Sequence, residues 1–146
     1  MSNELSNVSN IDTTVAVADS VELDIPNGYI CTVDRSTREG VITVANALSD
    51  AQSLADFCGE EAGRHFIVKD IITTPGVRNR TGEQCTNTYL VLADGSIYMS
   101  QSDGIKRSAQ QIVGLFNGDF GEGIEVSVVE KKLSNGNTMK TLHFYA

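Results

Sequence analysis

The stretch Asp103–Phe116, DGIKRSAQQIVGLF, determines the fold that we expect, because it carries the clearest helix signal in the chain. Its apolar residues recur at spacings of four, three and four, which place them on one helical face: Ile105, Ala109, Ile112 and Phe116. Ser102 or Asp103 is suited to cap the first turn. A helix with such a stripe can pack onto one end of a sheet.

On both sides of this helix, runs of β-branched and aromatic residues predict strands. Before the helix, the expected strands are residues 29–33, 41–45, 65–74, 88–92 and 96–99. After it, residues 124–133 and 138–145 predict two more, joined by a hairpin turn at 134–137. We expect Pro75–Gly76 to end the 65–74 strand, and residues 49–58 to form a short helix.

Taken together, these segments predict five strands with one helix between the third and the fourth. In this count, residues 29–33 and 41–45 together form the first strand, either as one bent strand or as a hairpin. Residues 96–99 are not counted separately, because they form a hairpin with the third strand, residues 88–92. This order is that of the OB-fold, a five-stranded barrel, so we expect a mostly β protein of that class. Another small β-barrel and an α+β sandwich are the alternatives. Residues 28–146 would form the domain, preceded by an acidic extension, residues 1–27.

The net charge of −8 is spread unevenly along the chain. Residues 1–27 contain five acidic residues and no basic one, whereas residues 62–117 contain six basic and four acidic residues. Nucleic-acid binding gains affinity from neutralised phosphates, so an acidic protein is a weak candidate, but its basic middle keeps that function open. Residues 1–10 lack a signal-peptide pattern and no apolar run could cross a membrane, so we expect a cytoplasmic protein.

Residues that could carry catalysis or bind a metal are few and scattered. The three cysteines form no C-x-x-C pair, and their odd number argues against a disulfide framework: Cys31, Cys58 and Cys85. Both histidines fall inside expected strands. The glycine-rich segment 117–123 is acidic and precedes a strand, unlike a phosphate-binding loop. We therefore expect a protein without enzymatic activity, metal or cofactor.

What remains is a surface for an extended ligand. Proteins that bind single strands without sequence preference combine a basic groove with aromatic rings that stack on bases. Strand alternation places Tyr89 opposite Leu90 and Tyr98 opposite Ile97, so we expect both rings to point away from the aliphatic core, with Tyr145 as a third candidate. Candidate phosphate contacts are Lys69, Arg78, Arg80, Arg107, Lys131, Lys132 and Lys140. The alternative is a partly buried core position for each ring and a solubilising role for each basic side chain.

Three stretches give the chain a family resemblance: residues 68–77 (VKDIITTPGV), 87–90 (NTYL) and 100–108 (SQSDGIKRS). They are similar to the small single-stranded DNA-binding proteins of phi29-like, protein-primed phages and related phages of Gram-positive bacteria. The likeness extends from about Val41 to the final strand, some 100 residues, and leaves the first forty outside it. Binding in that family involves tyrosines, which Tyr89 and Tyr98 match by strand position.

The resemblance implies a sequence-independent protein that coats and protects displaced single strands during phage DNA replication in the host bacterial cytoplasm. A phage DNA polymerase is the implied protein partner, no cofactor is implied, and the oligomeric state, monomer or homo-oligomer, stays open. The alternative function is a phage-encoded interaction or inhibitor domain that acts on a host protein, with the acidic extension as its contact. A titration with oligo(dT) separates the two functions. Binding that weakens with salt supports the DNA-binding function, and absence of binding at low salt contradicts it.

Overall fold

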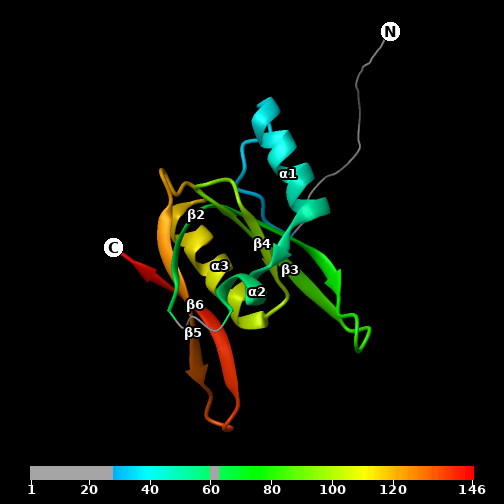
Figure 1. The fold of residues 1–146 in the computed structure, drawn as a ribbon, viewed down its shortest axis with the longest axis vertical. Coiled ribbons are helices and arrows are strands. Elements are labelled where there is room, and N and C mark those ends of the chain that lie inside the picture. Colours follow the sequence, from blue (N-terminus) through cyan, green and yellow to red (C-terminus); the bar gives the residue numbers. More distant parts are fainter. Residues whose placement is uncertain (1–27, 60–62) are drawn as a thin grey trace.

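The computed structural model describes residues 28–59 and 63–146, and its strands form one curled, half-barrel sheet (Figure 1). The helices are α1 (Arg38–Asp50), α2 (Leu54–Cys58) and α3 (Asp103–Phe116). The strands are β1 (Gln52–Ser53), β2 (His65–Val77), β3 (Gln84–Leu92), β4 (Ile97–Ser100), β5 (Ile124–Lys132) and β6 (Thr138–Tyr145). Their order in the sheet is β1-β4-β3-β2-β5-β6, with β1 parallel to β4 and the other pairs antiparallel. The expected acidic extension, 1–27, lies outside the described residues.

The long strand β2 bends the sheet because it changes partners along its length. Residues 65–68 pair with β5, and residues 68–77 pair with β3, with a bulge at Lys69 between the two ladders. Beyond Val68, residues 30–32 lie along the edge of β2 that β5 occupies earlier in the strand. The Thr32 amide donates to the Ile71 carbonyl at 3.0 Å. The first part of β2 therefore pairs with β5, and its later part pairs with β3 and with residues 30–32.

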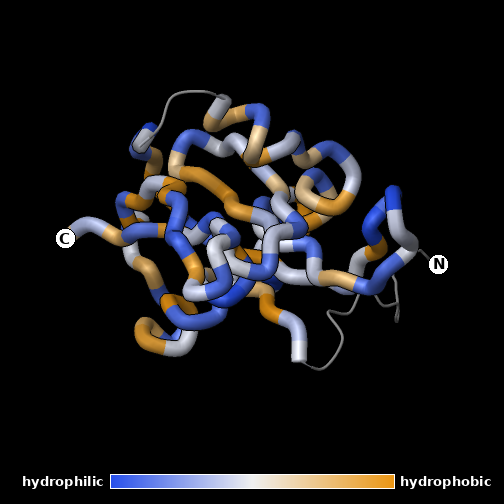
Figure 2. The backbone as a smooth tube through the Cα atoms, turned by 90° about the horizontal axis from the view of Figure 1, so that it is seen from below, coloured by the Kyte–Doolittle hydropathy of each residue, from blue (hydrophilic) through white to orange (hydrophobic). Residues whose placement is uncertain are grey.

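Two hydrophobic cores lie on opposite faces of this sheet. The larger core fills the inside of the curl, where α2 and α3 pack against β2, β3, β5 and β6; its fully buried members include Ile71, Leu90, Ile105 and Val126. The smaller core lies under α1, between Val44 and Ala47 and the side chains of Ile72, Tyr89 and Val91. Figure 2 shows hydrophobic segments in both helices and strands, while several connecting turns are hydrophilic.

Helix α3 lies against the outer edge of β6. The Ser108 hydroxyl accepts a hydrogen bond from the Leu142 amide at 3.1 Å and donates to the Gly104 carbonyl at 3.0 Å. Gly104 packs so closely that a Cβ there would overlap the Lys140 carbonyl. The helix starts at its Ser102 cap and ends at Asn117, whose positive φ of 54° is typical of a helix stop.

The structure confirms part of the expected order. The bounds of α3 are those expected, the β5–β6 hairpin is present, and α2 lies inside the expected 49–58 helix. The expectation of five strands and one helix is wrong, because the described residues form six strands and three helices, with α3 between the fourth and fifth strands. The mostly β class holds.

Three local expectations are also wrong. Residues 41–45 lie in helix α1, because Gly40, Val44 and Ala47 occupy one buried helical face and Thr37 caps the helix. Residues 29–33 form a single bridge, Cys31 to Ile72, and not a strand. β2 continues through Pro75–Gly76 to Val77, and a proline is tolerated there because, in the described chain, residues 74–77 pair with β3 alone.

Candidate nucleic-acid interface

Most basic side chains gather at one end of the molecule, which we call the basic end. It consists of the β2–β3 hairpin, the β5–β6 hairpin and the first turns of α3; both hairpins project beyond the body of the sheet (Figure 1). Its basic residues are Arg78, Arg80, Lys106, Arg107, Lys131, Lys132 and Lys140, against three acidic residues, Glu83, Asp103 and Glu130. The other described residues include four basic and nine acidic ones. An acidic chain therefore carries a locally basic surface.

Asp103 at the start of α3 connects two parts of the basic end. Its Oδ1 lies 3.6 Å from Arg78 Nη2 at the β2–β3 hairpin and 4.0 Å from Lys106 Nζ one turn along the helix. These pairs are partly exposed and long, so they contribute little stability. Both cations remain near solvent, and their charges exceed that of the single carboxylate between them.

The lysines of the β5–β6 hairpin lie on both of its faces. Val128 and Leu142 belong to the inner face of the sheet, and strand alternation continues that face to Lys132 on β5 and Lys140 on β6. Lys131, paired with Met139, lies on the opposite face. The hairpin therefore presents two lysines toward the helix side of the sheet and one away from it.

Strands β4 and β6 do not pair in the described chain, and α2 fills the opening between them. We call this surface the seam. A pocket of about 40 Å³ lies there, and α2, the end of β4, the β4–α3 connection, α3, β5 and β6 line it with these residues: Leu54, Ala55, Cys58, Ser100, Ser102, Ile105, Val128 and Lys140. Burial raises the pKa of the Cys58 thiol, while the positive charges of Lys140 and Arg64 oppose that shift. Cations thus flank the seam on both sides.

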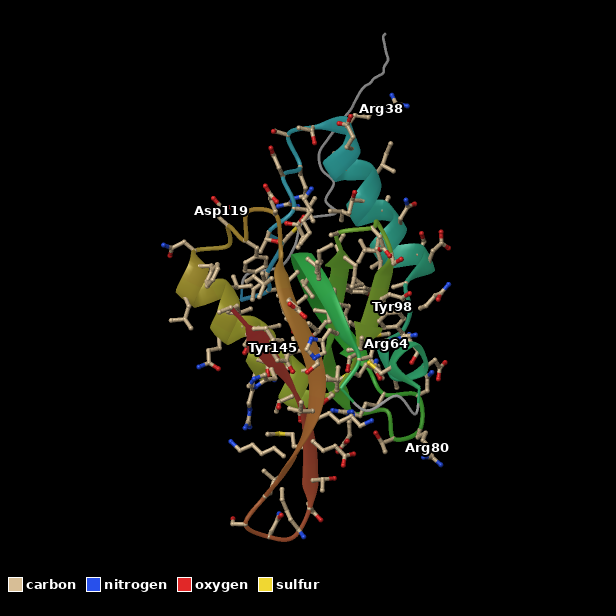
Figure 3. All side chains as sticks on the ribbon, turned by 60° about the vertical axis from the view of Figure 1, so that its left-hand side comes forward. Arg38, Arg64, Arg80, Tyr98, Asp119 and Tyr145 are labelled. Atoms are coloured by element: carbon tan, nitrogen blue, oxygen red, sulfur yellow. The ribbon has the colours of Figure 1, made fainter. Side chains whose placement is uncertain are left out.

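At the Arg64 side, the seam leads to a cleft beside Tyr98. The Tyr98 ring stacks on Phe57, with centroids 4.0 Å apart and planes 24° apart, and the Arg64 guanidinium lies 4.7 Å from the Phe57 centroid. Arg64 Nη1 also donates to the Phe57 carbonyl at 2.7 Å. Figure 3 shows Arg64 and Tyr98 on the same side of the sheet. The cleft has a volume of about 360 Å³, and His65 and Ile67 line it as well.

A second, more polar cleft of about 300 Å³ lies on the other side of Tyr98, between the end of α1 and the start of β4. Asn46, Asp50 and Gln52 line it. Tyr98 lines both clefts, so part of its ring is accessible even though it also packs against the larger core. This combination of a supported and an accessible ring suits stacking on a base.

Tyr145 belongs to an aromatic patch on the outer face of β2, β5 and β6, which meets the Tyr98 cleft at His65. Its ring stacks on His65 with centroids 4.2 Å apart, and the His143 ring meets it edge-on at 4.8 Å. Its hydroxyl lies 2.8 Å from Ser127 Oγ, and His65 Nδ1 lies 2.6 Å from Glu125 Oε2. The ring is therefore held by several contacts, and an acidic side chain lies beside it.

Tyr89 lies on the other face of the sheet from Tyr98. Tyr98 pairs with Leu90 and so shares a face of the sheet with it, whereas Tyr89 pairs with Met99. Because neighbouring residues of a strand point to opposite faces, the two tyrosine side chains lie on opposite faces of the sheet. Helix α1 covers the Tyr89 face, and that residue is only 6% exposed. The expectation that both rings point away from one core is wrong, because each face of β3 and β4 has a core of its own.

The remaining expected residues lie apart from the seam. Lys69 is exposed at the bulge of β2, eight residues before the hairpin end of that strand, and Arg80 is exposed in the β2–β3 turn. Arg107 is exposed on α3. Phe57, Arg64 and His65 were not expected at a site, since no sequence spacing places Phe57 next to Tyr98.

Within residues 28–59 and 63–146, no helix combines the length and apolarity that a membrane span requires. The same residues hold no group of three His, Cys, Asp or Glu side chains placed to bind a metal ion.

Comparison with known protein families gives a match over nearly the whole described chain. The family model of the phage single-stranded DNA-binding protein of the phi29 type matches residues 24–145. Comparisons with curated proteins and with solved structures give no significant match. The matched range covers every helix and strand described above, including the basic end and the Tyr98 cleft. The chain therefore belongs to the phi29-type family of phage single-stranded DNA-binding proteins.

Proposed function

We propose that the protein binds single-stranded DNA without sequence preference, and coats and protects displaced strands during phage DNA replication in the host cytoplasm. The phage DNA polymerase would act on the strands that it coats. The observation that carries this proposal is the gathering of seven basic residues at one end of an acidic chain, next to a cleft with an accessible aromatic pair. Single-strand binders combine these two features.

The proposed path of the strand runs along the seam, from the Tyr98 cleft to the basic end. Tyr98, supported by Phe57, would stack on a base, and Arg64 would neutralise a neighbouring phosphate. Across the seam, Lys140 and Lys132 would contact phosphates, and the strand would continue toward Arg78. We keep Arg80, Arg107, Lys131, Lys69 and Tyr145 as secondary contacts.

The connectivity of the sheet supports an OB-like origin for this path. Strands β2 to β6 follow the OB order, with a helix after the third of them, and β2 pairs with both β3 and β5. OB-folds bind oligonucleotides at their second and third strands and at the two loops that correspond here to the β2–β3 and β5–β6 hairpins. Because α1 covers the outer face of β3 and β4, we place the strand on the seam.

The test is a titration of the full chain with oligo(dT) at several salt concentrations, followed by tyrosine fluorescence. We expect quenching, and an affinity that falls with salt with a slope of about −0.7 for each phosphate neutralised. A duplex of equal length is the control, and we expect it to bind more weakly, since stacking needs accessible bases. Absence of oligo(dT) binding at low salt would contradict the proposal.

A matched pair of tyrosine substitutions separates DNA contact from core packing. Tyr98→Leu should weaken oligo(dT) binding about tenfold, because a stacked ring contributes about 1–3 kcal/mol, while leucine preserves the packing on Phe57. Tyr89→Leu should instead lower the free energy of unfolding by about 2 kcal/mol, because Tyr89 is buried under α1, and leave binding by the folded protein unchanged. Equal binding by wild type and the Tyr98 variant, measured with urea denaturation as the stability control, would remove Tyr98 from the site.

A further inference from the structure

The basic end carries more positive charge than the described residues around it neutralise. Its seven basic and three acidic residues give a net charge of +4, whereas the rest of the described chain, with four basic and nine acidic residues, carries −5. The contacts of Asp103 with Arg78 and Lys106 are long, at 3.6 and 4.0 Å, and partly exposed. The excess charge therefore faces solvent, where it attracts an anionic chain.

The first 27 residues of the chain carry the opposite charge. They contain five acidic residues and no basic one, so their side chains sum to −5: Glu4, Asp12, Asp19, Glu22 and Asp24. Three of the five fall within six positions, 19–24, just before the described chain begins at Gly28. In size and sign, the charge of this segment thus complements that of the basic end.

Residues 30–32 connect this segment to the side of the molecule where the basic end lies. They run antiparallel to β2, and the Thr73 amide donates to the Ile30 carbonyl at 2.8 Å. The chain that precedes Ile30 therefore starts toward the β2–β3 hairpin. Arg78 follows Thr73 by five residues, about 17 Å along the strand. The six residues from Asp24 to Ile30 can extend over about 20 Å, so the acidic positions 19–24 reach the hairpin.

The basic residues outside the basic end are poorer partners for this segment. Three of these four have an acidic residue next to them in the chain, in the pairs Asp34–Arg35, Arg38–Glu39 and Lys69–Asp70. The fourth, Arg64, contacts both the carbonyl and the ring of Phe57. Within the described chain, the basic end is thus the surface whose charge best complements that of the segment.

We propose that residues 1–27 bind the basic end of their own chain when DNA is absent, and that DNA and this acidic segment compete for the same cations. A covalent tether holds the segment at an effective concentration of roughly 1 mM, so a weak ionic contact is well populated. Salt weakens a contact between exposed charges. The competition rests on the proposed function, whereas the contact itself requires no DNA.

Amide NMR spectra of the full chain without DNA test the contact. The variant Glu4→Gln/Asp12→Asn/Asp19→Asn/Glu22→Gln/Asp24→Asn keeps the length of the segment and removes its charge. At about 20 mM salt, its amide shifts should differ from those of wild type at both hairpins and the first turn of α3. At about 300 mM salt these differences should disappear.

The same spectra distinguish the segment's own chain from a second copy. A contact within one chain gives shift differences that are the same at all protein concentrations. Differences that grow with concentration would indicate the segment of a second copy and would overturn the proposal. Identical spectra at low salt, or differences confined to residues 28–34 beside the segment, would also overturn it.

Titration with oligo(dT) tests the competition. The neutralised variant should bind about tenfold more tightly than wild type at about 20 mM salt, and less than about twofold more tightly at about 300 mM. If neither protein binds oligo(dT) at low salt, the proposed function fails, and the spectra without DNA still decide whether the contact exists.

Two backgrounds with equal loss of charge locate the competition. In the Lys132→Gln/Lys140→Gln background, neutralising the segment should increase affinity by less than about threefold, because two of the shared cations are gone. In the Arg35→Gln/Arg38→Gln background, the increase should stay about tenfold. The reverse pattern would place the segment on the start of α1. Equal increases in both backgrounds would mean that the segment acts through net charge alone, and either result would overturn the proposal.

Discussion

Replacing Gly104 with alanine is expected to lower the free energy of unfolding by about 3 kcal/mol, the largest stability change that we predict for a single methyl group. A Cβ at this position would overlap the Lys140 carbonyl oxygen and lie 2.6 Å from Met139 Cγ. The carbonyl belongs to the backbone of β6 and cannot rotate away, so α3 must shift outward. That shift would also break the hydrogen bond between Ser108 and the Leu142 amide.

Gly114→Ala is the matched control, because it makes the same change on the same helix. Nothing lies within 4 Å of a Cβ at that position, so alanine should raise the free energy of unfolding by about 0.5–1 kcal/mol through its higher helix propensity. Urea denaturation followed by circular dichroism would measure both variants. If the Gly104 variant is as stable as wild type, α3 does not pack on β6 at the separation described.

Removing two charges that face the seam is expected to have the largest effect on DNA binding. Lys132→Gln/Lys140→Gln should weaken oligo(dT) binding about 100-fold at moderate salt, and should reduce the slope of log affinity against log salt by about 1.4. The physical reason is that both lysines lie on the helix side of the β5–β6 hairpin, next to the proposed path. Salt-dependent fluorescence titration would measure both quantities.

The control removes the same charge at the opposite end of the molecule. Arg35→Gln/Arg38→Gln changes the net charge equally but lies at the start of α1, so affinity should change by less than about threefold and the slope should stay the same. Lys131→Gln, on the other face of the hairpin and only a secondary contact, should weaken binding less than the loss of either seam lysine. Equal losses in the two double variants would mean that net charge, and not the seam, determines binding.

The elements that sequence reasoning located correctly are those specified by nearby residues. Helix α3 has its cap at Ser102, its apolar stripe and its stop at Asn117 within sixteen residues. The β5–β6 hairpin likewise has its turn residues between two alternating runs. In each case the pattern and the propensity indicate the same structure, and the contacts that stabilise the element do not depend on distant segments for their register.

Helix α1 shows the opposite case. The run Val41–Ala45 is typical of a strand, yet the packing of Val44 and Ala47 on β2 and β3 overrides that propensity. The spacing of four and three from Gly40 to Ala47, together with Thr37 as a cap, was the signal that indicated a helix. Because the β-branched run favours a strand, the sequence does not predict that a helix covers Tyr89.

The sequence predicts the basic residues of the candidate site but not the cleft beside Tyr98. Composition and position in the chain indicate the basic residues of the two hairpins. The Tyr98 cleft depends on the parallel pairing of Gln52 with Tyr98, which brings α2 and Phe57 beside β4. That pairing joins residues 46 positions apart in the chain, and no local pattern specifies it.

The position of α3 on β6 also has a consequence for how the protein resists aggregation. An edge strand with free amide and carbonyl groups can act as a template for strands of other molecules. Here the Leu142 amide is occupied by Ser108, and the opposite edge of the sheet, β1, is only two residues long. Any change that lifts α3 would thus open the longer edge to strand addition by other molecules, and we expect such a change to promote aggregation.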